Sequence, residues 1–285
     1  MRKIGYVVCG NSGIDYIDHS YDIRVFRSQL LVGEREYTDF TDIKAEEFYS
    51  MIKENPDLHP TTAQTATGVM LETYEQMRDE GYEEIVVVTI SSKLSGTFEG
   101  AQMAANMVND VSVTVFDSKS VAYGEAYMVL EAARLGSEGK SVPQIIDHLS
   151  WIRENQGLLV SVDTLKYLVK NGRLSGASGF LGSFLKIKPM LMLSREGKIE
   201  PVEKIRTRQK AIERIIEKFT HELYDASMEV FVVHANAYDM VEYVQKELKK
   251  RLDYADEITT YPLTPVVGAH AGHGALAIGW VRKKA

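Results

Sequence analysis

The segment EEIVVVTI (83–90) is followed directly by SSKLSGT (91–97) and then by FEGAQMAANMVN (98–109). The first of these is an apolar run rich in β-branched residues, which predicts a buried strand. The third predicts a helix. A buried strand that leads through a short polar loop into a helix is the unit from which α/β sheets are built, so this stretch predicts an α/β fold.

The same alternation continues on both sides of this unit. We predict further strands at 3–10 and 111–118, and helices at 45–55, 69–80, 121–136 and 142–157. Strands that alternate with helices predict a mostly parallel sheet with crossover helices on its faces. This pattern gives the N-terminal half of the chain a parallel α/β architecture.

The C-terminal half has a different character. Residues 190–205 predict two strands around a turn at Glu196-Gly197, which is an antiparallel hairpin. Further strands are predicted at 158–162, 228–235, 257–263 and 275–281, and helices at 208–223 and 239–252. We therefore expect two α/β domains, 1–155 and 156–285, the second of α+β character.

Composition restricts the class of protein. The chain has 285 residues, of which 45% are hydrophobic and 26% charged, as in a soluble globular protein. Its net charge of −7 argues against nucleic-acid binding. A single cysteine, Cys9, cannot form an intrachain disulfide, which fits a reducing cytoplasm. No apolar run approaches the roughly 20 residues of a membrane span, so no transmembrane segment is expected.

Two histidines, His270 and His273, lie in GAHAGHGALAIGW (268–280). Zinc sites need three or four ligands, and no aspartate or glutamate lies within ten residues of this pair. We therefore expect no metal. Two alternatives remain from the residues alone: structural histidines in a turn, or a histidine that donates a hydrogen bond to an anion, approached closely because its neighbours are small.

Two polar loops precede predicted helices. The loop 91–97 follows a buried strand, where open α/β sheets bind ligands, and helix N-termini favour anions. Ser95 could instead simply cap the helix. The segment TTAQTATG (61–68) has the same character and no charged residue. Hydroxyl and amide donors of this kind suit a carboxylate better than a polyphosphate. The chain has no G-x-S-x-G elbow, no G-x-G-x-x-G fingerprint and no evident nucleophile–base pair.

The segment 166–193 has a basic N-terminal part and an apolar C-terminal part. The N-terminal part contains Lys166, Lys170 and Arg173, and the C-terminal part is rich in Phe, Leu and Met. It predicts either a core helix behind a solvated basic turn or the wall of an elongated apolar pocket beneath a basic patch. The apolar residues concerned are Phe180, Leu181, Phe184, Leu185, Ile187, Met190, Leu191 and Met192.

Seven motifs in order give the chain a family resemblance. They are TTAQ, SSKLSGTFEGA, FDSKSVAYG, VDTLKYLVKNGRLSGASGFLG, KIKPML, KIRTRQKAI and GAHAGHGALAIGW. Together they resemble the DegV family over residues 2–282. The resemblance implies a two-domain α/β protein with a lipid pocket between or within its domains. It also implies a cytoplasmic, non-catalytic subunit of a bacterial fatty acid kinase system, which binds a long-chain fatty acid and needs no cofactor. A separate ATP-dependent kinase subunit would convert the acid to an acyl phosphate for phospholipid synthesis.

The resemblance also implies roles for particular residues. Thr62 and Ser95 match carboxylate ligands, with Ser92 as the competitor of Ser95. His270, rather than His273, matches the family's histidine, and Arg173 matches a position that docks the kinase. Thr61 and Gln64 complete the expected ligand-binding set.

The chain departs from the family pattern at Asn11, where Asp is usual, and at Ala63 and Thr65, where Ser and Pro are usual. An alternative from a different class is a stand-alone enzyme that acts on an acyl or phosphoryl substrate, with His270 as base near Ser95.

Overall fold

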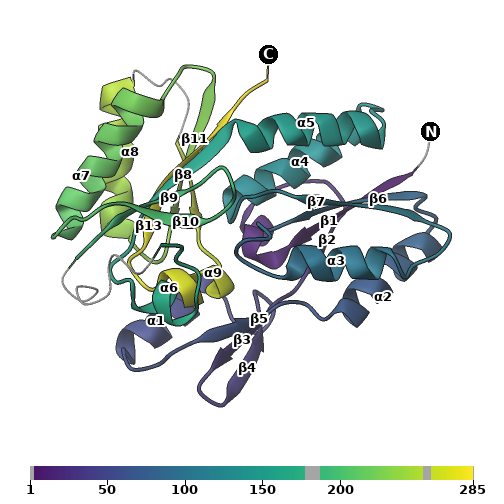
Figure 1. The fold of residues 1–285 in the computed structure, drawn as a ribbon, viewed down its shortest axis with the longest axis horizontal. Helices are drawn as coiled ribbons and strands as arrows, with labels where there is room; N and C mark the ends of the chain where they lie inside the picture. The colour runs from purple at the N-terminus through teal and green to yellow at the C-terminus, as the bar shows by residue number, and fades with distance from the viewer. Residues whose placement is uncertain (1–2, 177–186, 253–257, 285) are drawn as a thin grey trace.

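The computed structural model describes residues 3–176, 187–252 and 258–284, and within them the chain forms three sheets (Figure 1). The first has the order β2-β1-β6-β7, with every neighbouring pair parallel. Its strands are β1 (Ile4–Cys9), β2 (Ile23–Phe26), β6 (Glu84–Thr89) and β7 (Ser112–Asp117). The predicted α/β fold with a parallel sheet is confirmed.

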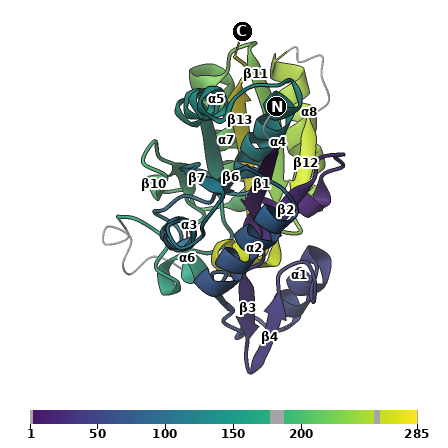
Figure 2. The ribbon, with the colours of Figure 1, turned by 90° about the vertical axis from the view of Figure 1, so that its right-hand side faces the viewer.

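Helices cover both faces of this sheet (Figures 1 and 2). They are α2 (Thr67–Asp79) and α3 (Thr97–Ala105) on one face, and α4 (Tyr123–Ser137) and α5 (Val142–Glu154) on the side of the other. Successive side chains of a strand point to opposite faces. Val87 accordingly packs in the α2 and α3 cluster, while Val86 and Val88 pack in the α4 cluster.

The second sheet has the order β10-β9-β8-β13-β11-β12. Its strands are β8 (Gln156–Ser161), β9 (Met190–Leu193), β10 (Ile199–Glu203), β11 (Met228–His234), β12 (Thr259–Pro262) and β13 (Leu276–Arg282). All pairs are antiparallel except β11 with β12, and β9 with β10 forms the predicted hairpin. Helices α7 (Arg208–Lys218) and α8 (Tyr238–Leu252) cover one face. Because the described strands from residue 156 onward all lie here, we keep 1–155 and 156–285 as a proposed domain division.

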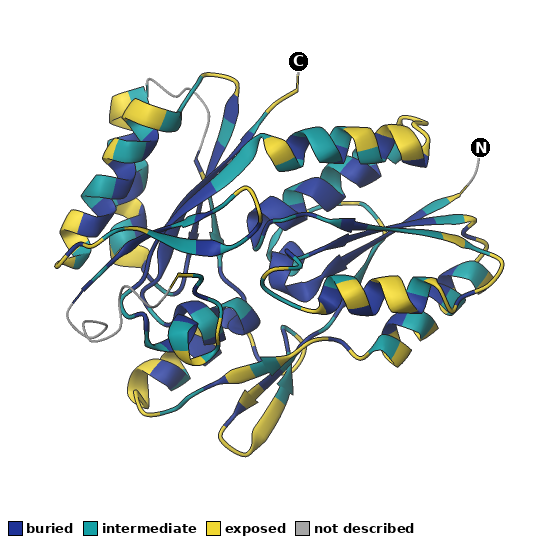
Figure 3. Ribbon diagram, viewed as in Figure 1, coloured by how far each residue is buried: buried dark blue, intermediate teal, exposed yellow. Residues whose placement is uncertain are grey.

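Helix α4 belongs to the core of both halves. Its Tyr123 ring stacks on Tyr261 at 4.2 Å and meets Phe231 edge-on at 4.6 Å. Ala126 and Ala132 on the same helix are fully buried, and the ribbon of α4 is mostly dark blue in Figure 3. One hydrophobic cluster therefore reaches from the first sheet to the second, and two further clusters lie under α2 and α3 and under α7 and α8.

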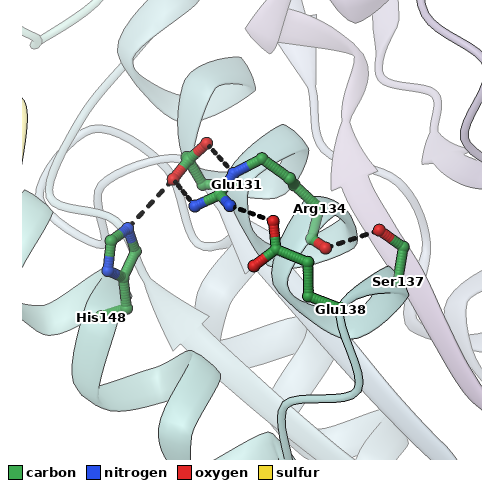
Figure 4. Close-up of polar contacts among 5 residues, drawn as sticks. All are labelled: Glu131, Arg134, Ser137, Glu138 and His148. Atoms are coloured by element: carbon green, nitrogen blue, oxygen red, sulfur yellow. Dashed lines mark hydrogen bonds and ion pairs between the residues drawn. The ribbon is translucent and has the colours of Figure 1, made fainter.

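A polar network fixes α4 against α5 (Figure 4). Glu131 accepts two hydrogen bonds from the Arg134 guanidinium, at 2.8 and 2.9 Å, and lies 3.1 Å from Nε2 of His148 on α5. Arg134 also donates to Glu138 at 2.6 Å. Helix α5 begins with a capping box between Ser141 and Gln144, which explains its sharp start.

A third, smaller sheet has the order β4-β3-β5 and lies beside α1, α6 and α9. These elements are β3 (Gln29–Val32), β4 (Arg35–Thr38), β5 (Thr61–Ala63), α1 (Ala45–Glu54), α6 (Lys166–Lys170) and α9 (Pro265–Ala271). Sequence patterning predicted no strand here, because β5 has only three residues and two of them are threonines. Half of the apolar residues predicted in 166–193 fall on 177–186, which lie outside the described residues, whereas Met190, Leu191 and Met192 belong to β9.

Candidate functional site

A cavity of about 420 Å³ lies where the parallel sheet, the mixed sheet and β5 meet. This volume is within the range of small-molecule sites, and its walls are mainly aliphatic. One wall is a row across four neighbouring strands of the mixed sheet: Leu191, Val160, Ala277 and Val233 are paired in register, and all four line the cavity. The smallest side chain of the row, Ala277, stands between two valines and leaves a hollow.

Thr62 and His270 meet at this cavity. Thr62 is the central residue of β5, which pairs with β3 through Leu30. Its Oγ1 lies 2.9 Å from Nε2 of His270, and both residues line the cavity. Two residues that are distant in the chain thus form one hydrogen-bonded pair.

His270 lies in a helix, and the expectation of a turn at this position is wrong. Helix α9 begins after Thr264, whose hydroxyl accepts a hydrogen bond from the Val267 amide at 3.5 Å, and Pro265 is its first residue. Gly272, with a φ of 78°, ends it. A cap residue followed by proline, with glycine after the last turn, is a helix signal that could have been found in the sequence.

Burial keeps the His270 imidazole neutral. It lowers the pKa of His270 to about 4, and the nearby charges of Arg173 and His59 act in the same direction. A neutral imidazole carries one N–H. Nδ1 is buried and has no hydrogen-bond partner among the described residues, so the single polar contact of the ring is the one to Thr62.

Ser95 and Gln64 line the cavity beside the first turn of α3. Ser95 Oγ lies 2.8 Å from Oγ1 of Thr97 and accepts a hydrogen bond from the Thr97 amide at the start of α3, whose N-cap residue is Gly96. Gln64 lies against two glycines of this turn: a Cβ at Gly96 would come within 2.7 Å of its Oε1, and one at Gly100 within 2.9 Å of its Nε2. Glycine at these positions lets the amide approach the helix.

Two other predicted ligands do not line the cavity. Ser92 donates a hydrogen bond from Oγ to Asp117 at 2.6 Å, at the end of β7. Thr61 is exposed at the start of β5. The geometry brings together Thr62, Ser95, Gln64 and His270, and it leaves Ser92 and Thr61 outside.

Arg173 lies in the lining as well. Its Nε donates to the carbonyl of Leu94 at 3.1 Å, and its Nη1 donates to the carbonyl of Asn171. Among the described residues, the cavity therefore has one cationic residue near His270, whereas the sequence pattern predicted only neutral donors for the head group.

A buried carboxyl group lies behind the cavity wall and was not found from the sequence. Glu125 on α4 is fully buried, accepts a 2.6 Å hydrogen bond from Asn11 and accepts one from the Cys9 amide at 3.3 Å. Asn11 itself lines the cavity. Burial raises the pKa of Glu125 to about 8, and the charge of Asp117 acts in the same direction. Because residue 11 is an asparagine, its side chain places an amide donor, and not a second carboxylate, beside Glu125.

Two further properties concern the described part of the chain only. Within residues 3–176, 187–252 and 258–284, His, Cys, Asp and Glu side chains form no group of three or more that could hold a metal ion. None of the helices described there has the length and apolar character needed to cross a bilayer.

Comparisons with known proteins place the chain among relatives of the same length. The DegV family model, described as a family of uncharacterised proteins, matches residues 15–283. A DegV domain-containing protein of Halalkalibacterium halodurans is 36% identical over 256 residues, which cover 90% of this chain and 89% of the relative.

Solved structures match the whole fold. DegV of Bacillus subtilis, described as a fatty acid binding protein, is 31% identical with a TM-score of 0.85, over 99% of this chain and 100% of that one. A DegV family protein of Thermus thermophilus, described by its fatty acid binding, is 26% identical with a TM-score of 0.86 over the same shares. The chain belongs to the DegV family.

Proposed function

We propose that this protein binds a long-chain fatty acid in the cavity, with its carboxylate at Ser95 and at Thr62, whose hydroxyl is hydrogen-bonded to His270. The observation that supports this most directly is a mainly aliphatic cavity whose lining includes the hydrogen-bond donors Thr62, Ser95 and Arg173. Each buried methylene of an acyl chain contributes roughly 0.8 kcal/mol, so the tail can supply most of the affinity. The fatty acid binding described for the Bacillus and Thermus proteins supports the same ligand class.

The Thr62–His270 pair suggests how the carboxylate is held. Because Nδ1 of His270 has no partner among the described residues, the tautomer with its proton on Nε2 leaves no buried N–H unpaired. In that tautomer Nε2 donates to Thr62, and the Thr62 hydroxyl is free to donate its own proton to a carboxylate in the cavity. A pKa of about 4 keeps His270 in this neutral form at physiological pH.

Ser95 is the serine that we assign to the head group. It lines the cavity, whereas the Ser92 hydroxyl is already bonded to Asp117. Gln64 lines the cavity and Thr61 does not, so Gln64 is the better candidate for a further contact.

We further propose that the protein is a non-catalytic cytoplasmic subunit that presents the carboxylate to a separate ATP-dependent kinase subunit. The resulting acyl phosphate would serve phospholipid synthesis. The alternative, a stand-alone enzyme with His270 as base, requires a contact between His270 and Ser95. Among the described residues Ser95 is bonded to Thr97 and His270 to Thr62, so this alternative has no supporting geometry.

Thr62→Val should weaken the binding of a long-chain fatty acid about tenfold, because a hydrogen bond to a charged group is lost while side-chain volume is kept. Ser95→Ala should act in the same direction. Isothermal titration with palmitic acid measures the affinities, and mass spectrometry of the denatured wild-type protein identifies any acid it carries. Thr61→Val, at the neighbouring exposed threonine, is the control. Unchanged affinity in both Thr62→Val and Ser95→Ala would reject the head-group assignment.

Arg173→Ala should lower acyl phosphate formation with the kinase subunit about tenfold, and it should lower fatty acid affinity by less than that. The physical reason is that Arg173 combines a cavity position with a partly exposed guanidinium that a second protein can reach. A coupled assay at saturating fatty acid separates the two effects. Lys170→Ala, which removes an exposed cation three residues earlier, is the matched control. A normal coupled rate for Arg173→Ala would exclude it from the docking surface.

A further inference from the structure

Asn171 occupies an unusual place among the helix-terminal asparagines of this chain. Asn55 and Asn155 follow helices α1 and α5, and each donates its side-chain amide to its own helix, to the carbonyls of Met51 and Trp151. Asn171 follows α6, yet its Nδ2 donates to the carbonyls of Pro60 at 3.3 Å and Ala269 at 3.0 Å. Since both partners are acceptors, the orientation of this amide is fixed: only the nitrogen can face them.

Those two carbonyls belong to the backbone that carries the proposed head-group pair. Ala269 precedes His270 in the last turn of α9, where carbonyl groups lack partners within the helix. Pro60 precedes β5, and Thr62 is the middle residue of that three-residue strand. One side-chain amide thus connects the segment of His270 to the segment of Thr62.

The third head-group segment is attached to the same point. The Arg173 guanidinium donates to the carbonyls of Asn171 and Leu94, and Leu94 directly precedes Ser95. The segments that carry Thr62, Ser95 and His270 are therefore joined through one short turn at the end of α6.

We propose that Asn171 is a positioning residue of the carboxylate site. Its side-chain amide holds the segments of Thr62 and His270 together, so that their side chains stay hydrogen-bonded. The inference rests on the proposed function, because it assumes that this pair receives a carboxylate. Asn171 does not line the cavity, so it acts on the ligand through Thr62 and His270. Loss of its amide should disturb recognition of the head group and leave the binding of the tail unchanged.

Palmitic acid and hexadecanol test this distinction, because they share the tail and differ in the head. In Asn171→Leu, which keeps side-chain size and removes the donors, the preference for the acid over the alcohol should fall about tenfold. Affinity for the alcohol should change less than about twofold. Asn55→Leu, the matched change at another helix-terminal asparagine, should leave both affinities unchanged.

A double-mutant cycle supplies the second readout. If Asn171 acts through Thr62, adding Asn171→Leu to Thr62→Val should lower the preference for the acid over the alcohol only slightly further. An equal loss of affinity for the acid and the alcohol would show a merely structural role and would overturn the proposal. An unchanged preference for the acid over the alcohol in Asn171→Leu would also overturn it. So would a full further loss of that preference when Asn171→Leu is added to Thr62→Val. If Asn171→Leu does not fold, Asn171→Gln, which displaces the amide by one carbon, takes its place with the same expectations. Wild-type protein that binds the alcohol as well as the acid, or neither, would reject the proposed function itself.

Discussion

Ala277→Phe is expected to abolish most of the affinity for long-chain fatty acids, with a loss of more than about a hundredfold. Ala277 is the small residue in the row Leu191–Val160–Ala277–Val233, and all four side chains line the cavity. A benzyl group in that hollow would displace on the order of four methylenes of the acyl chain. At roughly 0.8 kcal/mol for each buried methylene, the lost affinity is about 3 kcal/mol.

A graded series makes this test specific to the cavity. Ala277→Val should cause a smaller loss than Ala277→Phe, and octanoic acid should lose less affinity than palmitic acid because its tail needs less of the cavity. Without added ligand, the Ala277→Phe protein should unfold at a temperature near that of the wild type, since the ring extends into the cavity rather than into close-packed core. Unchanged affinity for palmitic acid in a folded Ala277→Phe protein would show that the tail lies elsewhere.

The fold could be predicted from the sequence where elements are long and strongly patterned. The strand at 84–89 and the crossover helices of the first half are of this kind, because their apolar residues must be buried on the parallel sheet. The small sheet was not predicted, since β5 has three residues and no apolar alternation. Helix α9 was missed although Thr264, Pro265 and Gly272 signal its two ends.

The site could be predicted only in part, for a different physical reason. Thr62 and His270 were chosen from a family resemblance, and their 2.9 Å contact depends on packing between β5 and α9 that no local pattern encodes. The hollow at Ala277 depends on the register of four strands that are far apart in the chain. Asn171 had no signal either, because its partners are backbone carbonyls.

Glu125→Gln is expected to remove a large pH dependence from the stability of this protein. Burial raises the pKa of Glu125 from 4.5 to about 8, so in the folded protein the carboxyl keeps its proton up to a pH at which the unfolded chain has lost it. The folded state therefore binds more protons between these two values, and the free energy of unfolding falls as the pH rises through this window. A shift of this size corresponds to on the order of 5 kcal/mol.

The replacement keeps the size and shape of the side chain at position 125 and removes its ionisable carboxyl group. The carbonyl oxygen of the introduced glutamine can still accept from the Cys9 amide, and Asn11 can reverse its own amide to accept from the new nitrogen. Urea unfolding of both proteins from about pH 5 to about pH 9 should show that the variant gains stability relative to the wild type as the pH rises. Asp39 and His270 have shifted pKa values of their own, raised and lowered respectively, but both proteins contain them and the difference cancels their contributions.

Glu99→Gln is the matched control, because it removes one exposed carboxyl in the first turn of α3 and leaves the buried Glu125 in place. Its stability difference from the wild type should change with pH far less than that of Glu125→Gln. A flat difference for Glu125→Gln would mean that the buried carboxyl ionises normally in the folded protein, with a counter-charge or water beside it.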